Sequence, residues 1–301
     1  MRPEAGGPFA TAFAPAKVNL FLHVGPPDVD GLHPIASLMV FAVRADEEVG
    51  DRLTFMPDGE GLTIEGPFAG GLRAGGENLI SRSRAALEGR AGAHPGGLTL
   101  HKALPLASGL GGGSSDAAAT VRLLNKAWAL GLSEAELSAL IAPLGSDMAA
   151  CLKARPVIAT GRGEILQPAP AFPDLPVVLV NPGVPSPTGA VYRAYDAGVA
   201  GEGANLPDWP RSVNTPAEMA GFIRSTRNDL EVPAMRLAPA IGEALGLLAA
   251  APETLLARMS GSGATCFALT ATGEAAASLA QRLSRQQPSW WVRACTLAGK
   301  R

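Results

Sequence analysis

Residues 9–24 form an apolar segment whose second half alternates with a period of two, which predicts a β-strand interrupted at Pro15. One face of this strand carries Lys17 and Asn19 among apolar neighbours. Buried polar groups need partners, so this pair indicates either an exposed sheet edge with a solvated lysine or a functional site. The pattern alone leaves both interpretations open.

The rest of the chain alternates between short apolar runs and longer segments of helical period. Strands are predicted at residues 38–43, 51–56, 98–104, 156–159, 177–181, 266–269 and 290–296. Helices are predicted at residues 77–90, 117–130, 133–144, 187–195, 239–250 and 274–285, with a loose loop at residues 198–211. Ser133 and Glu136 form a capping box at the start of the third helix. Helices that pair over a few antiparallel strands predict an α+β fold.

The most informative segment is PLASGLGGGSSDAAAT, at residues 105–120. Four of the five residues 109–113 are glycine, so backbone N–H groups can approach a ligand closely and converge on it. Residues 114–116, Ser-Ser-Asp, can cap the alanine-rich helix that runs to Gly131. Because the start of a helix offers unpaired N–H groups and a positive dipole end, the segment predicts a phosphate-binding loop.

A P-loop, a dinucleotide motif and a plain flexible loop each fit this segment less well. A P-loop has a Lys-Ser/Thr pair after its last glycine, whereas Gly113 is followed by two serines. A dinucleotide motif should follow a buried, continuously apolar parallel strand, whereas residues 98–104 alternate like a half-exposed antiparallel strand. A flexible loop would account for the glycines but not for the strong helix former that follows.

Composition narrows the class of partner. The 301 residues include 25 Lys and Arg against 27 Asp and Glu, so we expect no broad basic surface for nucleic acid. The three cysteines show no C-x-x-C spacing, and no apolar stretch approaches 18 residues. We therefore expect a cytoplasmic protein without nucleic-acid or membrane partners, and monomer and homodimer both remain open.

The glycine-rich loop resembles the ATP-phosphate loop of the GHMP kinases. Two further segments resemble motifs of this family and lie in the expected order, APAKVNLFLHV at residues 14–24 and MSGSGATCFAL at residues 259–269. The resemblance implies a two-domain α+β architecture with mixed or antiparallel sheets, helices, and an active site in the cleft between the domains. It divides the chain into an N-terminal ATP-binding domain, residues 1–155, and a C-terminal domain, residues 156–301.

The resemblance also implies ATP as the phosphoryl donor. The residues implied for nucleotide binding are Pro105, Leu106, Ala107, Ser108, Gly109, Leu110, Gly111, Gly112, Gly113, Ser114 and Ser115 in the loop, with Asn78 and Lys102 on the adenine side. Related kinases often use a serine for Mg²⁺ where this chain has Gly113. We therefore name no metal ligand and expect Mg²⁺ to be held mainly by the phosphates.

Two residues match the catalytic positions of the family. Lys17 would bring positive charge to the transferring phosphoryl group or the acceptor oxygen, and Asp147 would accept the hydroxyl proton or orient the hydroxyl group. Without the resemblance, Asp147 could equally be an ordinary turn residue that follows Gly145.

The doubled glycine before Ser-Ser most closely resembles the family member that phosphorylates the 2-hydroxyl of a cytidine-diphosphate methylerythritol, in the non-mevalonate isoprenoid pathway. Its acceptor-binding positions correspond to Asn19, His33, Thr188, Tyr192, Gly261, Ser262 and Gly263. That member usually has D-G-Y-H where residues 30–33 here read Asp-Gly-Leu-His. Leucine cannot stack as tyrosine does, so recognition of the base would depend more on Tyr192.

Three alternatives to these assignments remain open. The chain could be a mevalonate- or homoserine-type kinase, or a nucleotide-binding regulatory protein without turnover. Residues 260–265 could also form a mere β-turn.

Overall fold

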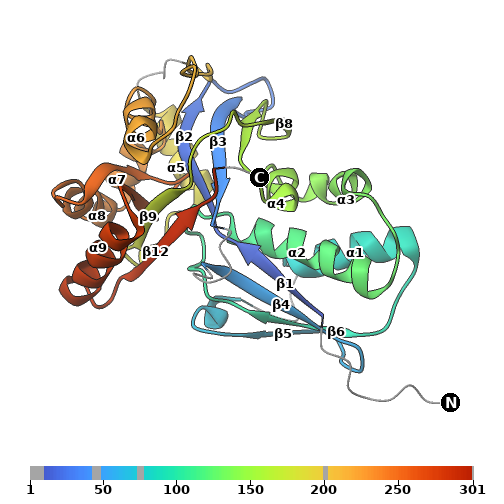
Figure 1. Ribbon diagram of the computed structural model, residues 1–301. Coiled ribbons are helices and arrows are strands. Elements are labelled where there is room, and N and C mark those ends of the chain that lie inside the picture. The colour runs from blue at the N-terminus through green and yellow to red at the C-terminus, as the bar shows by residue number, and fades with distance from the viewer. Residues whose placement is uncertain (1–9, 43–48, 73–77, 199–202, 300–301) are drawn as a thin grey trace.

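A computed structural model describes residues 10–42, 49–72, 78–198 and 203–299, which form three four-stranded sheets with helices packed against them (Figure 1). Helices and both antiparallel and parallel strand pairs are present, so the expected α+β class with mixed and antiparallel sheets is confirmed. Residues 9, 43, 77 and 199–202, which fall within predicted segments, lie outside the described residues.

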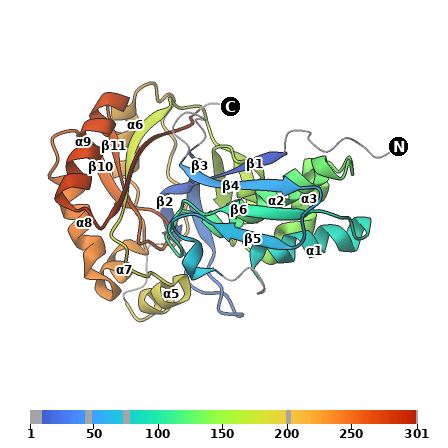
Figure 2. The same ribbon diagram turned by 90° about the horizontal axis from the view of Figure 1, so that it is seen from below.

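The first sheet has the strand order β1-β4-β6-β5 and carries helices on one face (Figures 1 and 2). Its strands are β1 (Thr11–Pro15), β4 (Gly50–Met56), β5 (Leu62–Glu65) and β6 (Gly97–His101), and only the β5–β6 pair is parallel among the described residues. Helix α2 (Gly112–Ala127) packs on β1 and β4. Around α2 lie the helices α1 (Leu79–Ala91), α3 (Glu134–Ile141) and α4 (Met148–Lys153).

The second sheet is antiparallel, with the order β2-β3-β7-β8. Its strands are β2 (Lys17–Val24), β3 (Ile35–Phe41), β7 (Val157–Thr160) and β8 (Ile165–Pro168). Strands β3 and β7 pair across residue 155, with Leu38 opposite Ile158. The proposed division into residues 1–155 and 156–301 thus separates strands of one sheet, and the division remains a proposal.

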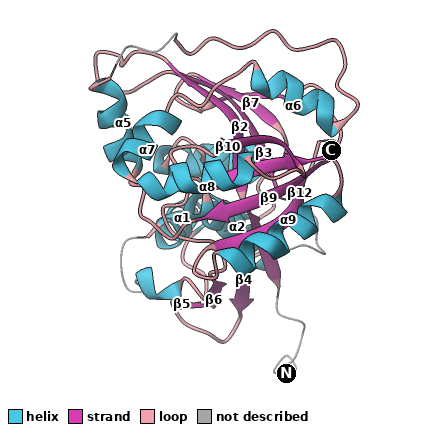
Figure 3. Cartoon of the chain, turned by 90° about the vertical axis from the view of Figure 1, so that its left-hand side faces the viewer, coloured by secondary structure: helices cyan, strands magenta, loops and turns pink. Residues whose placement is uncertain are grey.

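The third sheet, in the order β10-β11-β9-β12, is also antiparallel. Its strands are β9 (Leu175–Asn181), β10 (Thr254–Met259), β11 (Cys266–Thr270) and β12 (Trp291–Leu297). Helices α8 (Pro239–Ala249) and α9 (Gly273–Gln286) cover one face (Figure 3). Helix α6 (Pro216–Arg224) packs on β10 and β11, and α5 (Thr188–Asp196) packs against α7 (Glu231–Leu237).

Alternation along β9 divides the core into two parts. Val178 and Val180 belong to the cluster that includes α8 and α9, whereas Val177 and Leu179 belong to the cluster that includes β2 and α6. Since successive side chains of a strand point to opposite faces, the third sheet is covered on both faces. Strand β2 contributes side chains to both clusters, and every one of its residues is buried.

A bulge in β2 breaks the alternation that the sequence predicts. The pairing with β3 shifts register between Asn19 and Phe21. Phe21 then joins Val18 and Leu20 in one core cluster, while Leu22 faces the other. An extra residue in one strand of a pair reverses which face each later side chain occupies. Strict alternation predicts Leu20 and Leu22 on the same face, and this prediction is wrong.

The predicted elements appear with shifts of a few residues at their ends, but the pattern missed β5, β8, β10, α4, α6 and α7. Strand β5 alternates between apolar and polar residues, with Leu62 and Ile64 half-buried, but its four residues are too few to stand out as a strand. Strand β8 is largely exposed and equally short, and the six residues of α4 are mostly buried, so neither shows a clear two-faced pattern. No helix among the described residues is long and apolar enough to span a membrane.

Candidate active site

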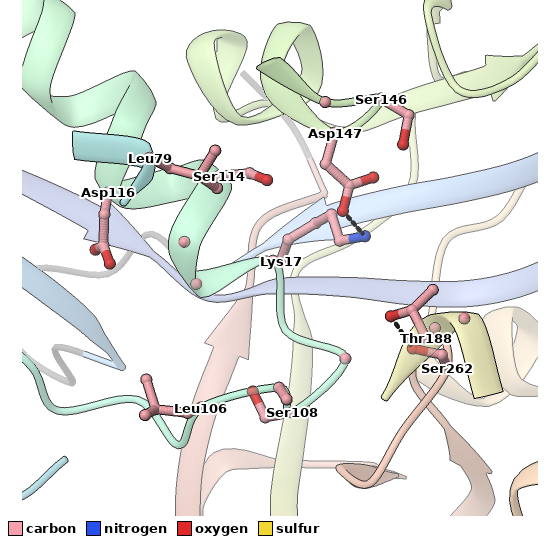
Figure 4. A pocket seen from close by; sticks show the side chains of 18 of the residues that line it. Lys17, Leu79, Leu106, Ser108, Ser114, Asp116, Ser146, Asp147, Thr188 and Ser262 are labelled. Carbon is pink, nitrogen blue, oxygen red and sulfur yellow. Dashed lines mark hydrogen bonds and ion pairs between the residues drawn. The ribbon is translucent and has the colours of Figure 1, made fainter. Parts of the chain in front are cut away.

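A pocket of about 1600 Å³ collects the motifs that the sequence singled out (Figure 4). Its lining comes from β2, the glycine-rich loop, the turn before α4, helix α5 and the loop after β10. These segments belong to both predicted halves of the chain. The hydrogen bond from the backbone N–H of Asn19 to Ser260 Oγ, for example, joins positions 241 residues apart.

The glycine-rich loop passes through left-handed backbone conformations before it enters α2. Gly109 and Gly111 have φ angles of 74° and 62°, a region that favours glycine. The N-cap of α2 is Gly111, so the predicted capping by residues 114–116 is wrong: they lie in the first turns of the helix. A Cβ at Gly111 would lie 3.1 Å from Cε of Lys17, which shows how closely the loop passes over that lysine.

Hydrogen bonds to two other segments hold the loop in place. Lys17 donates its backbone N–H to the carbonyl oxygen of Leu110 at 2.8 Å. From the opposite side, Ser260 Oγ donates to the oxygen of Gly109 at 2.9 Å, and the N–H of Thr265 donates to the oxygen of Ser108 at 3.0 Å. The loop is therefore pre-formed by contacts from β2 and from residues 260–265.

Most residues predicted for nucleotide binding line the pocket: Asn78, Lys102, Pro105, Leu106, Ala107, Ser108, Gly109, Gly111, Gly112, Gly113 and Ser114. Leu110 and Ser115 are not among the described lining residues. The Leu110 side chain is fully buried in the core, and the Ser115 hydroxyl donates to the oxygen of Pro15 at 2.8 Å. Their side chains point inward because the loop rests directly on the β1–β2 segment.

Lys17 and Asp147 meet in the pocket although 130 residues separate them (Figure 4). Lys17 Nζ donates to Asp147 Oδ2 at 2.7 Å. Lys17 is only 4% exposed, so the interpretation of a solvated lysine at a sheet edge is wrong. The Asp147 side chain, at the N-cap position of α4, keeps 27% of its surface accessible. Because it is partly accessible, the Asp147 carboxylate can contact a hydroxyl group of a ligand while it stays paired with Lys17.

Residues 260–265 do form a β-turn, closed by the N–H of Gly263 on the oxygen of Ser260 at 3.0 Å. The turn nevertheless faces the pocket, since Gly261 and Ser262 are lining residues. Ser262 Oγ lies 2.9 Å from Oγ1 of Thr188 at the start of α5, as Figure 4 shows. Gly263 is not among the described lining residues, because the place for its Cβ faces the Met259 side chain.

Two asparagines support this region, and only one of them stood out in the sequence. Asn228 donates from Nδ2 to the carbonyl oxygens of Met259 and Gly261, each at 2.8 Å, and thereby fixes the turn. Asn19 donates to Ser37 Oγ at 2.7 Å, while its buried Oδ1 has no hydrogen-bond partner among the described residues. The sequence offers no local signal for Asn228, because its partners are about 30 positions away.

His33 and Tyr192 form an aromatic contact at another part of the pocket wall, with ring centroids 5.0 Å apart. His33 Nδ1 lies 2.8 Å from the oxygen of Gly25, and its Nε2 lies 3.1 Å from Asp196 Oδ1. Burial raises the pKa of Tyr192 to about 12, and the negative charge of Asp147 adds to the shift. Tyr192 lines the same pocket as the Lys17–Asp147 pair.

Lys102 does not offer an unpaired ammonium group to a nucleotide. Its Nζ donates to Asp51 Oδ2 at 2.5 Å and to Asp116 Oδ2 at 2.7 Å, and all three residues are buried. Asp51 also accepts the N–H groups of Ala103 and Leu104, which lead into the glycine-rich loop. Asp116 directly follows the glycine-rich loop in the sequence, whereas nothing in the sequence indicates that Asp51, in β4, lies beside it.

The cluster of Lys102, Asp51 and Asp116 contains one carboxylate more than it has ammonium groups. Burial alone would lower the pKa of Lys102, but attraction to the two carboxylates raises it above its ordinary value. Burial raises the pKa of Asp116 to about 8, with Lys102 opposing the shift and Asp51 adding to it. Near pH 7 a protonated Asp116 leaves the cluster electrically neutral.

We expect the Asp116→Asn variant to lose part of the pH dependence of stability. In the folded protein Asp116 binds its proton more tightly than in the unfolded chain, so this group lowers the free energy of unfolding as the pH rises from about 4 to about 8. Urea unfolding at several pH values in this range should show a shallower decline for Asp116→Asn than for wild type. The exposed Asp58→Asn serves as the matched control, and an equal decline in all three proteins would contradict a raised pKa.

Two acidic residues of the pocket have cationic partners. Asp147 pairs with Lys17, and Asp116 pairs with Lys102. No group of three or more His, Cys, Asp and Glu side chains in the described part of the chain could hold a metal ion. A Mg²⁺ ion held mainly by nucleotide phosphates stays a proposal.

Comparisons with known proteins agree with this arrangement. The family models for the GHMP kinases N terminal domain and the GHMP kinases C terminal match residues 78–155 and 212–289. A protein of Caulobacter vibrioides (strain NA1000 / CB15N) named 4-diphosphocytidyl-2-C-methyl-D-erythritol kinase is 56% identical over 292 residues, covering 96% of this chain and 99% of the relative. A protein of the same name from Hyphomonas neptunium is 44% identical, covering 95% of this chain and 96% of the relative.

Solved structures show the same fold. A crystal structure of 4-(cytidine 5'-diphospho)-2C-methyl-D-erythritol kinase superposes with a TM-score of 0.74 at 35% identity, covering 96% of this chain and all of the other. Homoserine kinase from Cytophaga hutchinsonii gives a TM-score of 0.63 at 17% identity, covering 99% of this chain and 98% of the other, and supports the fold alone. With family models matched in both halves and relatives alike along nearly the whole length, this chain belongs to the GHMP kinases and is a kinase.

Proposed function

We propose that the protein transfers the γ-phosphoryl group of ATP to the 2-hydroxyl of 4-diphosphocytidyl-2-C-methyl-D-erythritol, a step of the non-mevalonate isoprenoid pathway. The observation that carries the proposal is the Lys17–Asp147 pair directly beside the glycine-rich loop in one pocket. The relatives from Caulobacter and Hyphomonas bear the name of this activity and match along nearly their full length.

The glycine-rich loop fits the phosphates of ATP. Its residues lack the side chains that would fill the space over Lys17, and its backbone enters α2 at Gly111 with unpaired N–H groups and a positive dipole end. Mg²⁺ would neutralise phosphate charge, and the phosphates would supply most of its ligands. Lys102 occupies Oδ2 of Asp116, and the other oxygen of this carboxylate is buried.

Lys17 and Asp147 would act on the hydroxyl group that attacks. Asp147 orients this hydroxyl group and accepts its proton, and Lys17 stabilises the negative charge that spreads over the transferring group. Because the two side chains form an ion pair, Asp147 need not be a strong base: aligning the hydroxyl group and balancing charge are a large part of its role.

The cytidine end of the acceptor would lie at His33 and Tyr192. Leu32 is half exposed at the pocket wall and can make only dispersive contacts there. The Tyr192 ring, held against His33, is the aromatic surface available for stacking, with Asn19, Thr188, Gly261 and Ser262 towards the reacting end.

We expect Tyr192→Ala to raise the KM for the cytidine substrate by about tenfold to a hundredfold, the usual worth of a base–aromatic stack. The KM for ATP should change little, because Tyr192 comes from α5 and contacts His33, which is not among the residues proposed for ATP. Tyr192→Phe keeps the ring and serves as the control. Leu32→Tyr should be tolerated. An unchanged cytidine KM in Tyr192→Ala would place the base elsewhere.

Release of ADP from ATP, measured with each acceptor of a panel, tests the function itself. The purified protein with ATP and Mg²⁺ should turn over the cytidine-diphosphate compound and neither mevalonate nor homoserine. Turnover of mevalonate or homoserine alone would reassign the substrate within the family, and ATP binding without turnover of any acceptor would favour a regulatory protein. The expected monomer or homodimer and the expected cytoplasmic location remain predictions.

A further inference from the structure

Arg193 is a cation of the pocket wall that lies apart from the Lys17–Asp147 pair. It lies on α5, one turn after Gly189. A Cβ built on Gly189 would lie 3.5 Å from Nη1 of Arg193, so the guanidinium extends back along the helix towards Thr188. Both Thr188 and Gly189 line the same pocket.

The Arg193 side chain forms no hydrogen bond or ion pair with any residue that the structure describes. The carboxylate three positions further along α5, Asp196, lies 3.1 Å from His33 instead. Among the other cations of the pocket, Lys17 pairs with Asp147, Lys102 pairs with Asp51 and Asp116, and Arg162 pairs with Asp30 at 2.5 Å. Arg82, on α1, also has no ion pair with a described residue. The N–H donors of the Arg193 guanidinium are thus available to a ligand.

Arg193 follows Tyr192 on α5, and its guanidinium reaches back along the helix to Gly189, next to Thr188. Tyr192, the neighbouring residue, contacts His33 at the proposed base site. Thr188, at the start of the helix, contacts Ser262 (Figure 4), and the turn that carries Ser262 is hydrogen-bonded to the glycine-rich loop through Ser260 and Gly109. A molecule that spans the pocket from Tyr192 to Thr188 passes the part of α5 where the Arg193 guanidinium lies.

We propose that Arg193 binds the diphosphate of the acceptor and so sets the preference for a nucleoside-diphosphate substrate over an unphosphorylated nucleoside. The inference rests on the proposed function, because that acceptor carries its diphosphate between the base and the reacting hydroxyl group. A guanidinium presents paired N–H donors that match phosphate oxygens, and hydrogen bonds between charged partners are about twice as strong as neutral ones. The donor phosphates have their own site at the glycine-rich loop.

Competition by cytidine and CDP against the cytidine-diphosphate acceptor tests this assignment. We expect wild type to bind CDP more tightly than cytidine, and Arg193→Ala to reduce that preference by about tenfold to a hundredfold through loss of the charged hydrogen bonds. The inhibition constant of cytidine and the KM for ATP should stay nearly the same. Arg193→Lys should restore part of the preference.

Arg236→Ala is the matched control, since it removes the same charge from an exposed position of α7, outside the pocket. An undiminished preference for CDP in Arg193→Ala would overturn the inference. So would a drop in kcat with no change in CDP binding, which would assign the guanidinium to the transferring phosphoryl group. If wild type neither turns over the acceptor nor binds CDP, the proposed function fails and this inference fails with it.

Discussion

Asp147→Asn is expected to reduce kcat by roughly 10²–10⁴-fold, the usual effect of removing a positioned acid–base group. The amide keeps the size of the side chain but cannot accept a proton, and it gives up the charge that now pairs with Lys17 at 2.7 Å. Lys17→Ala should reduce kcat over the same range by removing the positive charge beside the reacting oxygen. Steady-state assays with saturating ATP and acceptor measure both effects.

Calorimetry separates this loss of turnover from a loss of binding. Asp147→Asn should bind ATP nearly as well as wild type does, because the carboxylate addresses the acceptor. Asp58→Asn, an exposed substitution outside the pocket, should keep full activity. Near-wild-type kcat in Asp147→Asn or Lys17→Ala would remove that residue from the mechanism.

Gly111→Val is expected to abolish detectable ATP binding while the protein stays folded. The residue has φ of 62°, where a β-branched side chain is strained, and its Cβ would lie 3.1–3.4 Å from three carbons of Lys17. The substitution would therefore disturb both the backbone that faces the phosphates and the lysine beneath it. Calorimetric titration with ATP measures the binding, and circular dichroism verifies the fold.

Gly131→Val provides the matched control for backbone strain. Gly131 has a similar φ of 69°, but no atom outside its immediate neighbours lies within 4 Å of the place for its Cβ, and it lies outside the pocket. This variant should lose about 1–2 kcal/mol of stability through strain and still bind ATP. If Gly111→Val binds ATP as well as Gly131→Val does, the nucleotide is held elsewhere.

Local chemistry accounts for the features that could be predicted from the sequence. The capping box of Ser133 and Glu136 is confirmed, because its hydrogen bonds join residues only three positions apart. The glycine-rich loop and the helix after it were predicted for the same reason: φ angles and helix propensity are set largely by the residues themselves. The exact start of that helix was not predicted, because its N-cap is Gly111 and not one of the serines.

Resemblance to a family located the catalytic candidates, whereas the pattern around them was ambiguous. An exposed edge and a functional site were both compatible with Lys17 on an apolar strand. The burial of β2 between sheets and the contact of Lys17 with Asp147, 130 positions away, exclude the exposed edge, and the catalytic role of Lys17 stays a proposal. Neither can be read from neighbouring residues, because the free energy of placing a lysine inside depends on which carboxylate the fold brings to it.

The sequence by itself determined the fold class, the glycine-rich loop and its helix, and the residues that resemble catalytic ones, because periodicity, glycine content and short motifs are local properties. Only the tertiary structure decided which polar groups are satisfied. It paired Lys102 with Asp51 and Asp116, turned Leu110 and Ser115 inward, and left the Arg193 guanidinium without a partner among the described residues. These outcomes follow from long-range contacts that only the folded chain makes, and they set the charge and the open surface that a substrate meets.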